Sequence, residues 1–67
     1  MAKFKVDDIV VHKADKKTSM VIKQVHVNEP PVENEYTCEW TERGQTKRNV
    51  YVESSLAYDE PMGLFKG

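Results

Sequence analysis

The sequence predicts an all-β fold, a small barrel of four to five antiparallel strands with one short helical turn near the C-terminus. Short apolar stretches, several of which alternate apolar with polar residues, are typical of half-buried strands. Clusters of Asp, Asn, Pro, Gly and Ser separate these stretches at the spacing of tight turns. No stretch has the period of a helix of normal length, so strands have to form the core.

The first strand is predicted over residues 9–13. The segment before it, Phe4-Lys5-Val6-Asp7-Asp8, leads into the strand through a tight bend at Asp7-Asp8, where carboxylates can accept local backbone hydrogen bonds. Ile9-Val10-Val11 is a run of three β-branched residues, which favours a strand over a helix. A run without alternation indicates that both faces of this strand are at least partly covered.

The second strand is predicted over residues 20–27, after a polar, turn-like segment at 14–19. Its alternation of apolar residues is broken after Ile22. A bulge or sharp bend near Lys23-Gln24 would bring the two halves of the strand into agreement. Strongly bent second strands are common in small barrels, because one strand has to serve both sheets.

The third strand, residues 35–42, is predicted to be central. It follows a loop at 28–34 in which two prolines end the ladder. Tyr36, Cys38 and Trp40 fall on one face, and they include the only Cys and the only Trp of the chain. We therefore expect this face to cover the core, although an exposed Trp40 would instead be a binding platform.

The fourth strand, residues 46–52, is predicted to form a hairpin with the third through a turn at Arg43-Gly44-Gln45, in which Gly can take a positive φ. We expect Val50 and Val52 to point inward and Tyr51 to point outward.

A helical turn at 53–56, in which Leu56 closes the end of the core, is predicted to precede a last short strand. The barrel is expected to span residues 1–60. Residues 61–67 form a C-terminal tail with two glycines, which is expected to be mobile unless Leu64 and Phe65 dock on a surface.

Length and composition limit the possible functions. A chain of 67 residues forms one domain and buries only about 60% of its unfolded surface, which leaves little room for an enclosed active site. One Cys forms no internal disulfide and fits a reducing compartment. The sequence has no signal peptide and no run near the ~20 apolar residues of a membrane span. We expect a soluble, cytoplasmic protein that does not bind membranes.

The residues needed for most site chemistry are missing. One Cys and two His are too few for a zinc site, and the three glycines form no phosphate-binding loop. Cys38 lies on the expected core face, where a thiol has a raised pKa and is inert. The paired carboxylates fall in turns or on exposed faces, whereas a general acid needs a desolvated pocket. We expect no metal, no cofactor and no enzymatic activity.

Several short motifs resemble those of a known family. The opening Phe4-Lys5-Val6-Asp7-Asp8-Ile9-Val10 resembles the F-x-V-G-D-x-V opening of many SH3-like barrels. Met20-Val21-Ile22, Cys38-Glu39-Trp40 and the closing Ser55-Leu56 are similar to the M-T-V, C-x-W and L of the YodC-like family, small bacterial proteins with a domain of unknown function. The resemblance covers residues 4–57.

This resemblance implies an SH3-like barrel and no established activity. The chain departs from the family pattern at three places: Asp7 replaces a Gly, residues 14–17 replace an S-G-G-P turn, and the 28–34 loop is longer. These departures concern the conformation of loops more than the fold.

The function expected is that of a small interaction module. The first hypothesis is binding of a protein or peptide, including a homodimer, since SH3-like barrels bind through aromatic residues on one rim. The candidate contacts are Tyr51, Tyr58, Ile9 and Val11. A rim with two exposed aromatic side chains would favour this hypothesis.

The alternative is weak binding of nucleic acid, as in a transcription- or translation-associated SH3-like domain. The net charge is −1, but residues 1–27 carry an excess of three positive charges and residues 28–67 an excess of four negative charges. Sequence halves interleave in a barrel, so a mixed surface is expected, and a continuous basic face would favour nucleic acid. The candidate contacts are Lys16, Lys17, Arg43, Lys47 and Arg48.

Overall fold

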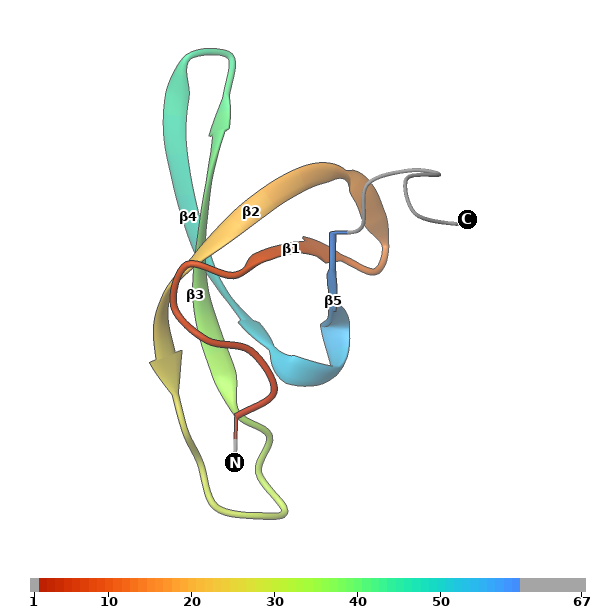
Figure 1. Ribbon diagram of the computed structural model, residues 1–67, viewed down its shortest axis with the longest axis vertical. Helices are drawn as coiled ribbons and strands as arrows, with labels where there is room; N and C mark the ends of the chain where they lie inside the picture. The colour runs from red at the N-terminus through yellow and green to blue at the C-terminus, as the bar shows by residue number, and fades with distance from the viewer. Residues whose placement is uncertain (1, 60–67) are drawn as a thin grey trace.

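The computed structural model describes residues 2–59 (Figure 1), which form one antiparallel sheet of five strands in the order β4-β3-β2-β1-β5. This confirms the all-β class, the number of strands and the helical turn. The elements are β1 (Ile9–His12), β2 (Asp15–His26), β3 (Glu35–Glu42), β4 (Gln45–Val52), the 3-10 helix η1 (Glu53–Ser55) and β5 (Leu56–Tyr58). The predicted tail at 61–67, with Leu64 and Phe65, lies outside the described residues.

The sheet does not close into a complete barrel. Within residues 2–59, no ladder joins the two edge strands β4 and β5, which are connected through η1. The expected barrel is therefore open. The same part of the chain contains no helix long and apolar enough to cross a membrane.

The second strand begins earlier than predicted. β2 starts at Asp15, because its first half pairs with β1, with Val10 opposite Met20 and His12 opposite Asp15. The polar residues at 15–19 were expected to form a turn. These residues instead form the start of β2, where the strand is mostly exposed to solvent, and this exposure explains their polarity. The turn is confined to the two residues before Asp15.

β2 is bent where the sequence indicated. Its second half pairs with β3, and the register shifts between Ile22 and Gln24, which confirms the predicted bulge. At this point the backbone of Ile22 bonds the N-terminal segment: its N–H donates to the Asp8 carbonyl (3.0 Å), and its carbonyl accepts from the Asp7 N–H (2.8 Å). The first half of β2 thus belongs with β1 and the second half with β3.

The β3–β4 hairpin corrects the predicted faces of β4. Tyr51 lies directly opposite Tyr36, and Val50 lies opposite Thr37. Residues opposite each other share a face of the sheet. Tyr51 therefore packs against the core, whereas Val50 and Val52 are exposed on the outer face. The prediction that Val50 and Val52 point inward was wrong, because the register of β4 differs by one residue from the predicted one. A shift of one residue exchanges the inward and outward positions of a strand.

Substitutions in the β3–β4 turn are expected to change the free energy of unfolding through the backbone conformation. Arg43 and Gly44 both have positive φ values, 53° and 78°, as a two-residue type I′ turn requires. Asn tolerates this region better than Arg, so Arg43→Asn is expected to raise the free energy of unfolding by about 0.5–1 kcal/mol. Gly44→Ala should lower it by about 1 kcal/mol through backbone strain alone, because a Cβ there meets no atom within 4 Å. Urea unfolding measures the stability of each variant, and stabilities equal to that of the wild type would contradict the type I′ turn.

The core lies on the inner face of the curved sheet. Of the residues predicted to be inside, Tyr36, Cys38 and Leu56 are fully buried, and Trp40 is partly buried against them. Phe4 joins the core from outside the strands. The buried cluster consists of Phe4, Val10, Met20, Ile22, Tyr36, Cys38 and Leu56, with Val25, Trp40 and Tyr51 packed against it.

Candidate functional site

A groove lies between the β1–β2 hairpin and the β3–β4 hairpin, where β2 turns away from β3. Its volume is about 320 Å³. Four strands contribute to it, so the bend of β2 and the register of β4 together determine which side chains meet there. The lining residues are His12, Asp15, Thr18, Met20, Trp40, Glu42 and Tyr51.

Three aromatic rings from three strands meet in this groove. The Tyr51 ring makes an edge-to-face contact with His12, at 5.1 Å between ring centroids. The Trp40 ring lies 6.5 Å from the Tyr51 ring and is tilted by 41° to it. Aromatic side chains supply large contact areas with little loss of side-chain entropy, which makes them effective binding surfaces.

The polar side chains around the rings are held in place locally. His12 accepts a hydrogen bond at Nδ1 from the Ala14 N–H (3.0 Å), which orients its ring. Asp15 accepts one at Oδ1 from the Lys17 N–H (3.1 Å). Glu42 ends β3 and is exposed to solvent. Two carboxylates therefore line an otherwise aromatic groove.

The groove is flanked by two strand edges that have no ladder partner. β2 pairs with β3 only from Val21 to His26, so its first half faces no strand on that side. Trp40, Thr41 and Glu42 pair with β4 but not with β2 among the described residues. Figure 1 shows β2 leaving β3 at this point and running on beside β1. Unpaired edges of this kind can hydrogen-bond an added strand.

The predicted protein-binding residues are not all together. Tyr51 lies in the groove. Ile9 is 43% exposed on the outer face, whereas Val11 is 4% exposed and offers almost no surface to a partner. A partner could contact Val11 only if its side chain were partly exposed, so its burial removes Val11 from the candidate contacts.

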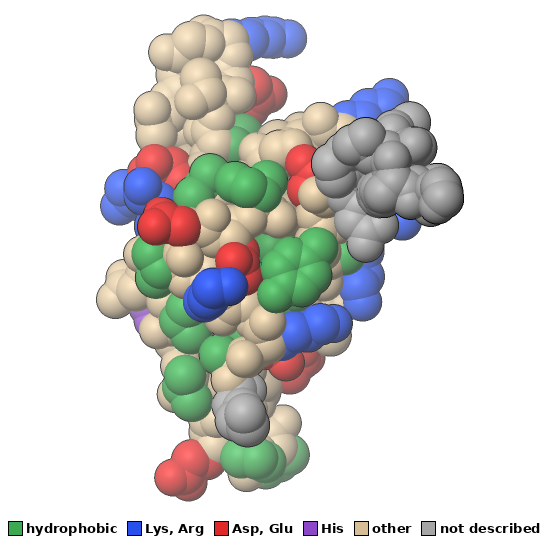
Figure 2. All heavy atoms as spheres, in the orientation of Figure 1, with side chains coloured by type: hydrophobic (Ala, Val, Ile, Leu, Met, Phe, Trp, Pro, Cys, Tyr) green, Lys and Arg blue, Asp and Glu red, His purple; other side chains and the backbone are tan. Residues whose placement is uncertain are grey.

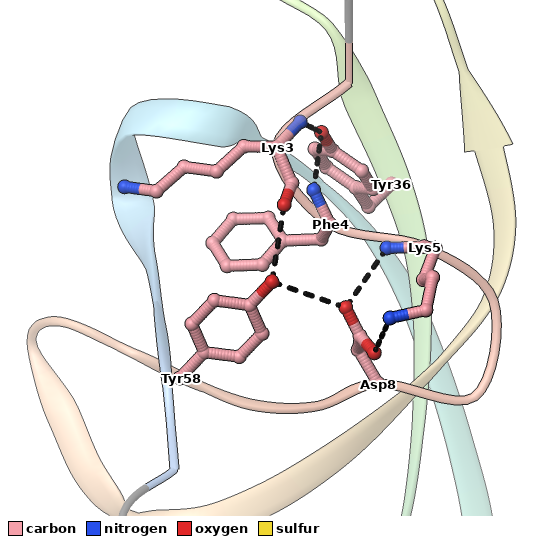
Figure 3. A network of polar contacts seen from close by, with 6 residues as sticks. All are labelled: Lys3, Phe4, Lys5, Asp8, Tyr36 and Tyr58. Carbon is pink, nitrogen blue, oxygen red and sulfur yellow. Dashed lines mark hydrogen bonds and ion pairs between the residues drawn. The ribbon is translucent and has the colours of Figure 1, made fainter.

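Tyr58 lies outside the groove lining and contacts the N-terminal segment instead (Figure 3). Its ring meets the Phe4 ring edge to face at 4.9 Å. Its hydroxyl is placed to donate to the Lys3 carbonyl (3.1 Å) or to Asp8 Oδ2 (3.3 Å). The Lys5 N–H donates to the same Asp8 oxygen, and this hydrogen bond lowers the pKa of Asp8. Tyr58 therefore fastens the N-terminal segment, although its side chain is half exposed.

The predicted nucleic-acid contacts are spread over the molecule. Lys16 and Lys17 lie at the start of β2, and Arg43 is at the tip of the β3–β4 hairpin, which projects in another direction (Figure 1). Lys47 and Arg48 alternate on opposite faces of β4. On the face seen in Figure 2, acidic and basic side chains are mixed.

One of these basic residues already has a partner. Arg48 donates through Nη2 to Glu39 Oε2 (2.7 Å), and this contact lowers the pKa of Glu39. The structure therefore does not bring the five basic candidates together, and Arg48 is engaged within the sheet.

Cys38 is a core residue, as the alternation of β3 predicted. Its side chain is fully buried, and its Sγ–H points to the Tyr36 carbonyl at 3.8 Å. Burial raises the pKa of this thiol to about 11, so it stays protonated at neutral pH. Within residues 2–59, no three His, Cys, Asp or Glu side chains form a group that could hold a metal ion.

A polar cluster around Glu53 is absent from the sequence-based predictions. Glu53 Oε1 accepts hydrogen bonds from the Lys3 N–H (3.1 Å), from Asn34 Nδ2 (3.3 Å) and from the Tyr36 hydroxyl (2.5 Å). The bond from Tyr36 is the main cause of the lowered pKa of Glu53, and burial is the main cause of the raised pKa of Tyr36. The cluster joins three segments that are distant in the sequence.

The sequence-based predictions missed five of the groove residues, namely His12, Asp15, Thr18, Met20 and Glu42. A strict two-residue turn at Arg43-Gly44 would have placed Tyr51 on the face of Trp40. The broken alternation of β2 was the only sequence signal that the β1–β2 hairpin would approach Trp40 and Tyr51. Comparisons with family models, with curated proteins and with solved structures gave no match.

Proposed function

We propose that this protein is a non-enzymatic, cytoplasmic interaction module that binds an extended segment of a protein partner in the groove between its two hairpins. The observation that supports the proposal is the meeting of His12, Trp40 and Tyr51 beside two unpaired strand edges. Neither a cofactor nor a metal is part of the proposal.

The form of the groove favours a peptide over a small substrate. Pockets for small molecules usually have ~300–1,000 Å³ and enclose most of the ligand. This groove has a volume of about 320 Å³, at the lower end of that range, and it is partly open to solvent, so it would enclose only part of a small molecule and accommodates one or two side chains of a longer chain. The backbone of that chain could pair with the free edge of β2 or β3, which gives affinity independent of sequence.

Two alternatives have weaker support. Self-association through edge strand β4 would use the exposed Val50 and Val52, but Asn49 Oδ1 already accepts a hydrogen bond from the Val50 N–H (2.8 Å), which an added strand would need. Binding of nucleic acid would need a continuous basic face, and the five basic candidates do not form one. Sedimentation at several concentrations tests the first alternative, and titration with RNA and DNA at low salt tests the second.

A substitution that fills the groove tests the proposal. Peptides are first selected from a random displayed library, and their affinities are measured through the fluorescence of Trp40, the only Trp. Thr18 lines the groove on β2, so Thr18→Arg is expected to weaken binding by about tenfold or more, the loss usual for a blocked central contact. Thr46→Arg makes the same change at an exposed position on the outer face of β4, opposite Thr41 and outside the groove lining, and should leave binding unchanged. Failure to select any peptide, or equal losses in both variants, would contradict the proposal.

A further inference from the structure

We propose that the side chain that enters the groove is cationic, a Lys, a methylated Lys or an Arg of the partner segment. This inference rests on the peptide-binding function proposed above and names the chemistry that the groove selects.

The rings leave surface for a cation. Trp40 and Tyr51 are tilted by 41° at 6.5 Å, so they are not stacked, and part of each face has no aromatic partner. His12 meets Tyr51 edge to face, at an interplanar angle of 63°, and so does not lie flat on that ring. A cation is attracted to the negative face of Trp or Tyr within about 6 Å of the ring centroid, most strongly where water is partly excluded.

The charges of the groove have one sign. Asp15 and Glu42 line it, and no Lys or Arg is among the described residues that do. Asp15 receives hydrogen bonds from the Lys17 N–H and the Thr18 hydroxyl, and a carboxylate has about four acceptor sites, so it can receive another donor. Complementary charge of this kind selects partners and disfavours an acidic side chain.

Basic residues adjoin the groove without lining it: Lys16 and Lys17 follow Asp15 on β2, and Arg43 and Lys47 line an adjoining depression. Lys47 lies opposite Trp40 in the hairpin register, and it lines that depression with Glu42, Arg43 and Gln45. Glu42 is shared between the two hollows. A cation in the groove therefore gains from both Glu42 and Asp15, whereas Lys47 weakens the attraction at the hairpin end.

Substitution within a bound peptide tests this inference separately from peptide binding. Each position of the tightest selected peptide is replaced in turn by Lys, trimethyl-Lys, norleucine and Glu. At one position, Lys and trimethyl-Lys are expected to bind about tenfold more tightly than norleucine, which has the same apolar stem without the charge. If norleucine equals Lys at every position, the inference fails while peptide binding stands.

The ratio of the affinity of the Lys peptide to that of the norleucine peptide tests whether the groove carboxylates attract the cation. Glu42→Gln and Asp15→Asn are each expected to reduce that ratio about two- to fivefold, the range for an exposed ion pair. Glu35→Gln, at the opposite end of β3, should leave the ratio unchanged. An unchanged ratio in both groove variants would overturn the role of the carboxylates, even if both peptides lost affinity equally, because an equal loss shows only a structural effect.

Discussion

Ile22→Ala is expected to remove a large part of the free energy of unfolding. A domain of 67 residues is typically stable by about 3–10 kcal/mol. Ile22 is fully buried in the core, and truncation of a buried Ile to Ala costs about 2–5 kcal/mol through lost burial and the cavity that remains. The variant should therefore be partly unfolded under conditions in which the wild-type protein is folded.

The site of Ile22 has little freedom to collapse around the cavity. Both of its backbone groups bond the N-terminal segment, through Asp7 and Asp8, and Cys38 lies opposite it on β3. The bulge of β2 follows immediately, so a shift of this residue would disturb both halves of the strand. Because the backbone is held from two sides, the upper part of the range is expected.

Two measurements would check this prediction. Urea unfolding followed by Trp40 fluorescence gives the change in stability. The rate at which a thiol reagent labels Cys38 gives the population of opened molecules, because the folded protein buries that thiol. Val27→Ala, at a residue that is 63% exposed, is the control and should change stability by less than about 0.5 kcal/mol. A loss below about 1 kcal/mol for Ile22→Ala would contradict the central position of this side chain.

The parts of the fold that follow local rules were predictable. The third strand was predicted with its observed bounds, because residues 35–42 alternate strictly and are bounded by a proline loop and a Gly turn. The bulge near Lys23-Gln24 was also predictable, since an alternation that changes phase within one strand requires an extra residue.

The groove and the faces of β4 depend on pairing between strands, which local patterns do not give. Val50, Tyr51 and Val52 are all compatible with a core position, and only the register opposite Tyr36 decides among them. His12 and Trp40 are distant in sequence and meet the same groove because β2 bends between them. The loss of pairing between β2 and β3 before Val21 is indicated in the sequence only indirectly, by the broken alternation that predicted the bend of β2.

The second large effect is expected at Glu53, where Glu53→Gln should lower the free energy of unfolding by about 1–3 kcal/mol at neutral pH, the cost of disrupting hydrogen bonds to a charged group. The carboxylate connects the Lys3 N–H, Asn34 and the Tyr36 hydroxyl. An amide keeps the shape of the side chain, but it loses the charge and places an NH₂ group where one of the oxygens was. Glu29→Gln, in the exposed 28–34 loop, is the matched control and should have little effect.

The pH dependence distinguishes the charge of Glu53 from its packing. The hydrogen bond from Tyr36 holds the pKa of Glu53 in the folded state below the ordinary value of 4.5. The carboxylate therefore stabilises the fold above about pH 4.5, and this contribution is lost as the pH falls through the lower folded-state pKa. Protonated Glu resembles Gln in shape and charge, so the stabilities of wild type and Glu53→Gln should approach each other in acid.

The difference between the two proteins is the quantity to measure, because the lowered pKa values of Asp8 and Glu39 make both proteins acid-sensitive. Tyr36→Phe removes the main donor to Glu53, so in that background Glu53→Gln should cost less at neutral pH and its effect should depend less on pH. Urea unfolding of all four proteins between about pH 3 and pH 7 gives the comparison. A difference that stays constant over this range would mean that Glu53 acts through packing alone, and the lowered pKa would then have no part in holding the N-terminal segment to the sheet.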